Sequence, residues 1–184
     1  LTASDKGAAG KREDLSGPAA KEIMEQAGYT VVDMRILPDE RQLLAETMKE
    51  ICDKGTADLI LTTGGTGFSP RDWTPEATLD IAERQVPGFS EAMRAASLAI
   101  TPRAMLSRGV SVIRKQTLIV NLPGSPKAVR ENLEVILPAG TRTGYFNGKC
   151  GRMRAVRRKS YEEEIWYDGI GNDFDSRHAG RLRQ

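Results

Sequence analysis

The chain has 184 residues, 39% of them hydrophobic, which is enough for one domain with a sizeable core. No run reaches the ~18 apolar residues that a membrane span needs, and the first residues lack the apolar core of a signal peptide, so composition argues against a membrane or secreted protein. Two cysteines, Cys52 and Cys150, do not make a disulfide framework and indicate a cytoplasmic location.

Charge and histidine content restrict the kinds of catalytic site, metal site and partner that we expect. The single histidine, His178, argues against Ser-His-Asp catalysis and histidine-rich metal sites, so any metal ligands should be oxygens, as magnesium prefers. Residues 1–138 hold 17 Lys/Arg and 19 Asp/Glu, whereas residues 139–184 hold 10 and 6. The basic tail shows no aromatic–basic periodicity, so we expect a solvated tail rather than a nucleic-acid partner.

Helical and strand patterns alternate along the chain. The opening LTA indicates the end of a strand. Helices are predicted over residues 16–28, 39–55, 74–84, 87–99 and 123–137. Strands are predicted over residues 29–37, 58–62, 110–114 and 117–122. The predicted N-caps are Ser16, Asp39, Thr74 and Ser125. This alternation predicts an α/β fold with a mostly parallel sheet covered on both faces.

In such a sheet, ligands bind beyond the carboxyl ends of the strands. Three loops rich in small and polar residues follow predicted strand ends, at residues 3–14, 62–72 and 121–126. If the strands are parallel, these loops converge on one edge of the sheet.

The loop TTGGTGFSPRD has more glycine than a turn requires. Because Gly64, Gly65 and Gly67 carry no Cβ, their backbone N–H groups can approach a phosphate closely, and Thr63 and Thr66 add hydroxyl donors. The loop is neither a P-loop nor a dinucleotide GxGxxG motif. The alternative is a tight strand-to-helix turn.

The loop NLPGSP is a second candidate anion site. Pro123, Gly124 and the hydroxyl of Ser125 precede a predicted helix N-terminus, which attracts anions. The alternative is an ordinary N-cap with Pro126 at the first helical position.

Three carboxylates, Asp5, Asp39 and Asp72, fall near predicted strand ends. Carboxylates beside phosphate sites make sense when a cation offsets the repulsion, and magnesium held by carboxylates and phosphate oxygens is the usual solution. Asp39 has an alternative role as a helix cap. A further carboxylate, Asp14, is interpreted as a plain loop residue.

Between a predicted helix and strand stands MLSR, at residues 105–108. Ser107 could donate a hydrogen bond to a ligand, and Arg108 could meet phosphate charge. The alternative for both is a solvated turn.

At TTGGTGFSPRDWTPEAT the sequence resembles the molybdopterin adenylyltransferases, which include the Mog-type enzymes and the G domain of gephyrin. The resemblance continues through SDKG, EDLSG, ILPDE, PGFSEAMR, MLSRGV and LIVNLPGSP, and it covers about residues 3–138 in order. It implies a three-layer α/β/α fold and a homotrimer. It also implies transfer of AMP from Mg-ATP to molybdopterin, with release of pyrophosphate and hand-off of the product to a molybdate-insertion protein.

The resemblance also implies roles for individual residues. Asp39 and Asp72 match the family's essential carboxylates, with Asp72 expected to hold Mg²⁺ and Asp39 to orient a substrate or a metal-bound water. The family's GGTG and PGS contacts to phosphate and pterin groups, and the SD motif at the pocket edge, fall on Gly64, Gly65, Thr66, Gly67, Gly124, Ser125 and Asp5.

The C-terminal part departs from the family pattern. We expect residues 1–138 to form the molybdopterin-binding and adenylyltransferase domain, and residues 139–184 to form an atypical, poorly ordered basic tail. Codons for TGYFNGKCGRMRA, read one base later, can encode an amphipathic segment of the family's usual kind. We therefore hypothesise that the sequence after about residue 139 comes from a shifted reading frame.

Two alternatives to the transferase remain open. One is a non-catalytic molybdopterin-binding or scaffold module, because gephyrin-like proteins also organise partners. The other is a related domain of molybdate-insertion or nicotinamide-nucleotide-processing proteins, because a shared fold alone does not fix function.

Overall fold

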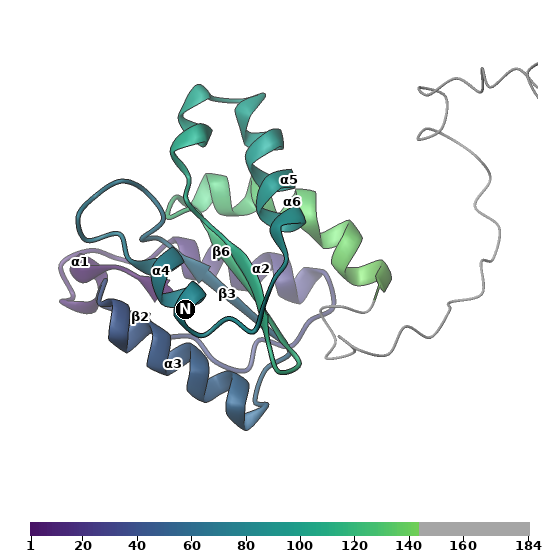
Figure 1. The fold of residues 1–184 in the computed structure, drawn as a ribbon. Helices are drawn as coiled ribbons and strands as arrows, with labels where there is room; N and C mark the ends of the chain where they lie inside the picture. The colour runs from purple at the N-terminus through teal and green to yellow at the C-terminus, as the bar shows by residue number, and fades with distance from the viewer. Residues whose placement is uncertain (144–184) are drawn as a thin grey trace, which may run out of the picture. The chain divides into compact units, whose positions relative to one another are not determined.

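The computed structural model describes residues 1–143, which contain a six-stranded sheet with the strand order β2-β1-β3-β6-β5-β4 (Figure 1). The strands β2, β1, β3 and β6 run parallel, and β5 and β4 are antiparallel to their neighbours. The strands are β1 (Thr2–Ala3), β2 (Ile36–Leu37), β3 (Leu59–Thr63), β4 (Arg84–Gln85), β5 (Ser111–Arg114) and β6 (Thr117–Leu122).

Helices cover both faces of this sheet, so the three-layer α/β/α prediction is confirmed. Figure 1 shows α3 and α6 on opposite sides of it. The helices are α1 (Asp5–Ala8), α2 (Ser16–Gln26), α3 (Arg41–Lys54), α4 (Thr74–Asp80), α5 (Pro87–Leu98), the 3-10 helix η1 (Pro102–Leu106) and α6 (Pro126–Thr143). None of the helices in residues 1–143 combines the length and apolarity that a membrane crossing requires.

The central strand β6 shows why the sequence forms three layers. Its residues are all buried, and consecutive side chains point to opposite faces. Leu118 and Val120 pack into the core beneath α2, α5 and α6, whereas Ile119 packs into the core beneath α3 and α4. A continuous apolar run is the pattern of a strand buried on both faces.

The predicted strand over residues 29–37 is wrong in its first part. Only Ile36 and Leu37 form β2, because β1 offers just Thr2 and Ala3 as pairing partners. Residues 29–35 instead border a cavity of about 880 Å³ next to β3. The short elements α1, β4 and η1 were not predicted, and α6 continues past the predicted end at residue 137 to Thr143.

Three of the four predicted N-caps are also wrong. The N-cap positions of α2, α3 and α4 are occupied by Leu15, Glu40 and Trp73. Only Ser125 caps as predicted, since its hydroxyl accepts a hydrogen bond from the N–H of Ala128 at 3.2 Å.

Asp14 does the capping expected of Ser16 at the start of α2. One of its carboxylate oxygens accepts hydrogen bonds from the N–H groups of Ser16 and Gly17 and from the Ser16 hydroxyl, and the other accepts one from Thr2. Burial opposes ionisation of Asp14, but these hydrogen bonds outweigh it and lower the pKa.

The predicted boundary at residue 138 falls inside α6. We predicted a poorly ordered tail and a shifted reading frame for residues 139–184. Of these, the residues after Thr143 lie outside the described part of the chain. Both stay predictions.

Candidate active site

The loops that follow β1, β3 and β6 meet at one edge of the sheet. A Cβ built on Gly64 would lie 2.4 Å from the carbonyl oxygen of Ala3, and one built on Gly124 would lie 3.2 Å from the Cα of Gly64. The glycine loop and the PGS loop are therefore in direct contact, as the parallel topology predicts.

Glycine is required at two positions of this edge. Gly64 and Gly65 have φ angles of +87° and +61°, a region that side chains disfavour. A Cβ on Gly65 would also lie 2.3 Å from the hydroxyl oxygen of Thr74. The crowding shows that these glycines permit close approach of three chain segments as well as a turn.

The glycine loop presents unpaired backbone donors. In the described part of the chain, the N–H groups of Gly65, Thr66, Gly67 and Phe68 donate to no protein acceptor, whereas that of Gly64 donates to Leu122. Consecutive free amides in a turn with positive φ values form a concave nest that binds anions.

A second set of donors stands next to it. Within residues 1–143 the N–H groups of Gly124, Ser125 and Lys127 also lack protein acceptors, and they precede or begin α6. The N-terminus of this long helix adds a favourable potential for negative charge. The two neighbouring loops can together hold a ligand with more than one phosphate group.

Two aspartates link the loop after β1 to the segment that follows β2. The N–H of Asp5 donates to Oδ2 of Asp39 at 3.2 Å, and the N–H of Asp39 donates to Oδ1 of Asp5 at 3.0 Å. Asp39 stands one residue before Glu40, the N-cap residue of α3, and its side chain makes no capping hydrogen bond to that helix.

Asp39 is 9% exposed, and its second oxygen, Oδ1, has no partner within the described residues. Burial raises the pKa of Asp39, and the charges of Asp5 and Asp72 add to this effect. Oδ1 would lie 2.7 Å from a Cβ on Gly65, so the carboxyl group borders the glycine loop. Perturbed carboxyl groups of this kind are typical of functional sites.

Asp72 borders the same loop from the other side. Its Oδ2 accepts a hydrogen bond from the N–H of Ser69 at 3.0 Å and would lie 2.9 Å from a Cβ on Gly67. The structure thus brings Asp39 and Asp72, predicted from separate motifs, to the same glycine loop.

An arginine closes the outer rim. Nε and Nη2 of Arg71 donate to the two carboxylate oxygens of Asp5 at 3.0 and 2.8 Å. This bidentate pair lowers the pKa of Asp5. No local sequence pattern indicates this partner of Arg71, which lies 66 positions away.

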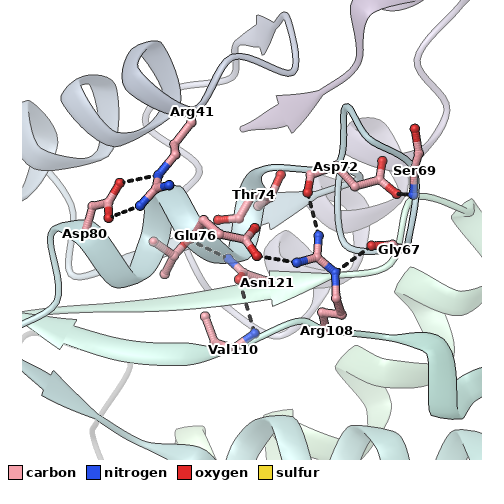
Figure 2. A network of polar contacts seen from close by, with 11 residues as sticks. Arg41, Gly67, Ser69, Asp72, Thr74, Glu76, Asp80, Arg108, Val110 and Asn121 are labelled. Carbon is pink, nitrogen blue, oxygen red and sulfur yellow. Dashed lines mark hydrogen bonds and ion pairs between the residues drawn. The ribbon is translucent and has the colours of Figure 1, made fainter.

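Arg108 lies beneath the loop, where Figure 2 shows its guanidinium group between Gly67, Asp72 and Glu76. Nε donates to the carbonyl of Gly67 at 2.7 Å, Nη2 donates to the carbonyl of Asp72 at 2.5 Å, and Nη1 pairs with the Glu76 carboxylate. Arg108 was expected to meet phosphate charge, but its donors are directed to the protein itself.

The remaining candidates divide between two environments. The Thr63 hydroxyl is bonded to those of Ser16 and Thr2, away from the loop surface. Thr66, Ser107 and Pro123 line a cavity of about 270 Å³ between the glycine loop, α5, η1 and α6. Thr66 and Gly67 of the first set of free amides line this cavity, and so do Pro123 and Ala128, which flank the second set, so a ligand with a phosphate at the loops could extend into it.

The donor set is compatible with magnesium but not with a closed protein site. Among the described residues, no cluster of three His, Cys, Asp or Glu side chains could hold a metal ion. Asp72 and the half-unpaired Asp39 border the predicted phosphate position, which fits an ion shared between one or two carboxylates and phosphate oxygens.

Fold and site together define an α/β protein whose free amides and carboxylates at the carboxyl edge of the sheet suit an anionic, phosphate-bearing ligand. Comparison with known proteins gives the family. Residues 1–142 match the model of the probable molybdopterin binding domain, and the chain belongs to this family.

Named relatives agree with this assignment. The molybdopterin adenylyltransferase of Haemophilus influenzae is 47% identical over 136 residues, which cover 73% of this chain and 69% of that protein. The molybdopterin adenylyltransferase of Escherichia coli K12 is 45% identical over 141 residues, covering 76% and 72%. The solved structure of the molybdopterin biosynthesis enzyme MoaB from Thermus thermophilus superimposes with a TM-score of 0.74 at 44% identity, over 80% of this chain and 94% of that one.

Proposed function

We propose that this chain is a molybdopterin adenylyltransferase, which transfers AMP from Mg-ATP to molybdopterin and releases pyrophosphate in molybdenum cofactor biosynthesis. Two of the relatives described above are named molybdopterin adenylyltransferase, and each aligns with most of this chain. The structural observation that supports it most is the row of free amides at residues 65–68, which lies beside the second set at the start of α6.

The reaction has simple requirements. An oxygen of the molybdopterin phosphate forms a bond to the α-phosphorus of ATP, and the bond from that phosphorus to the bridging oxygen breaks, so that pyrophosphate leaves. Little covalent work falls to the protein, and the rate enhancement comes from positioning and charge stabilisation. The two amide-rich loops would hold the two phosphate-bearing substrates next to each other, with the pterin directed into the adjoining cavity.

In this proposal Asp72 would hold Mg²⁺ together with phosphate oxygens, and Asp39 would orient a substrate or a metal-bound water. The ion supplies charge neutralisation, without which the carboxylates would repel the phosphates. Asp5 would act at the rim, where Arg71 holds it.

The decisive test compares Asp72→Asn with Asp80→Asn. Asp72 precedes α4 and Asp80 is the last residue of this helix, where it forms an exposed ion pair with Arg41 away from the glycine loop (Figure 2). We expect Asp72→Asn to lower AMP transfer about 100-fold or more while molybdopterin binding persists, and Asp80→Asn to behave as wild type. Adenylylated molybdopterin and pyrophosphate are the products to quantify, and wild-type turnover by Asp72→Asn would refute the assigned role.

The scaffold alternative makes a different prediction for the same assay. A non-catalytic module would bind molybdopterin but form no adenylylated product with Mg-ATP. The retention of Asp39 and Asp72 at the glycine loop favours the enzyme.

Assembly and partners extend the proposal. We expect a homotrimer that hands its product to a molybdate-insertion protein, and a molar mass measured by light scattering tests the first part. The cytoplasmic location and the lack of a nucleic-acid partner stay predictions.

A further inference from the structure

Arg108 donates hydrogen bonds to three backbone carbonyl groups of the glycine loop. Its own N–H donates to the carbonyl of Thr66 at 2.9 Å, Nε donates to the carbonyl of Gly67 at 2.7 Å, and Nη2 donates to the carbonyl of Asp72 at 2.5 Å. One residue thus fixes the two ends of the loop that carries the free amides and the Asp72 carboxylate.

The direction of these bonds determines where the amides point. In a trans peptide unit the C=O and the following N–H point in opposite directions. Because Arg108 draws the carbonyls of Thr66 and Gly67 toward itself, the N–H groups of Gly67 and Phe68 point away from it. These are two of the four amides at residues 65–68 that lack a protein acceptor within the described part of the chain.

Arg108 is partly buried together with a carboxylate partner. The Arg108 side chain is 32% exposed, and the guanidinium pairs with Glu76, whose side chain is 28% exposed. The fixed fork of a guanidinium holds two carbonyls and a carboxylate in set directions, whereas the three donors of a lysine ammonium sit on one nitrogen at the end of a flexible stem and impose no such geometry. The planar group therefore acts as a template for the loop.

We propose that Arg108 is the positioning residue of the active site: it orients the amides of Gly67 and Phe68 and places Asp72, without touching substrate itself. This inference rests on the proposed adenylyl transfer. It explains why an arginine beside a phosphate site directs each of its three guanidinium nitrogens to a protein acceptor.

The variants Arg108→Lys and Arg108→Gln test this role, with Arg114→Gln as the matched control. Arg114 likewise combines a bidentate carboxylate pair, with Asp53, and a bond to a carbonyl, that of Ile81, but it stands at the far end of β5 from Arg108. Arg114→Gln removes the same kinds of contact and leaves the hydrogen bonds to the glycine loop in place.

We expect Arg108→Lys, which keeps a cation beside Glu76, to lower kcat about 100-fold, because small misplacements of reacting groups cost that much. The KM for molybdopterin should stay within about 3-fold, since ground-state binding uses other groups as well. Hydrogen–deuterium exchange of residues 64–73 should become faster in both Arg108 variants. Arg114→Gln should change neither kcat nor exchange in this segment.

The outcomes separate this inference from the proposed function. If the wild-type protein transfers AMP and Arg108→Lys keeps its kcat, the positioning role is overturned. If the wild-type protein transfers no AMP, the proposed function fails, and exchange of residues 64–73 alone decides whether Arg108 organises the loop. Unchanged exchange in that segment overturns the inference in either case.

Discussion

Replacing Asp39 by asparagine should make the protein more stable and less active. The wild-type carboxyl group is buried, its Oδ1 has no partner among residues 1–143, and the charges of Asp5 and Asp72 act on it. Asparagine has the same shape, keeps an oxygen for the Asp5 N–H and carries no charge. The substitution therefore removes an unfavourable charge without creating a cavity.

The magnitude follows from the charge on the carboxylate, because the amide group of asparagine would fill the same place without a charge. An unpaired buried polar group costs about 1–3 kcal/mol, and a charged one costs more. Since Asp39 keeps one hydrogen bond from Asp5, we expect the difference between the charged and the neutral group to be small, a gain of about 1 kcal/mol in the free energy of unfolding near neutral pH.

The raised pKa of Asp39 determines how the stability difference between the two proteins changes with pH. Because folding raises the pKa of Asp39, the protonated form fits the fold, and its contribution is fully present below the unfolded pKa and lost as pH rises through the folded pKa. The advantage of Asp39→Asn over wild type should therefore grow as pH rises from the ordinary carboxyl pKa of 3.8 through the raised pKa of the folded state.

Urea unfolding of both proteins across this range measures the effect, and AMP transfer measured in parallel should fall. Asp53→Asn is the control, because Arg114 lowers the pKa of Asp53 and its neutralisation should destabilise. A lower unfolding free energy for Asp39→Asn, or a gain independent of pH, would refute the reasoning.

Gly64→Ala and Asp14→Ala test the loops around the site, and Gly28→Ala is the control for the first of them. Gly64→Ala should lower the free energy of unfolding by about 2 kcal/mol or more, because φ is +87° and the new Cβ would lie 2.4 Å from the carbonyl of Ala3. Gly28→Ala, with φ of +86° and no atom within 4 Å of the new Cβ, should cost only about 1 kcal/mol, and equal losses in urea unfolding would contradict the contact argument. Asp14→Ala should lose about 2 kcal/mol, because four hydrogen bonds disappear. The lowered pKa of Asp14 means that the wild-type advantage should vanish as pH falls through that pKa, and thermal unfolding at several pH values measures this.

The central strands could be predicted because each is a short apolar run that can be recognised in the sequence without knowledge of its partners. The strands β3 and β6 are short apolar runs that form the middle of the sheet. The strand β2 could not be bounded this way, since residues 29–35 have strand-like composition but no length of β1 beside them. Pairing partners, rather than propensity, set its ends.

The meeting of the loops could also be predicted, because parallel strands place their carboxyl ends at one edge. The roles of individual polar groups there were less accessible. Asp39 and Thr74 have the residue types of N-caps, yet neither caps a helix, because tertiary contacts fix Asp39 against Asp5 and place Thr74 behind Gly65. The long-range contacts of Arg108 have no sequence period to reveal them.

A crystal structure with Mg²⁺ and a non-hydrolysable ATP analogue tests the central claim most directly. We predict that phosphate oxygens accept hydrogen bonds from the amides of residues 65–68 and that the ion contacts Asp72. A nucleotide bound away from both the glycine loop and the start of α6, or an ion that contacts neither Asp39 nor Asp72, would contradict the account.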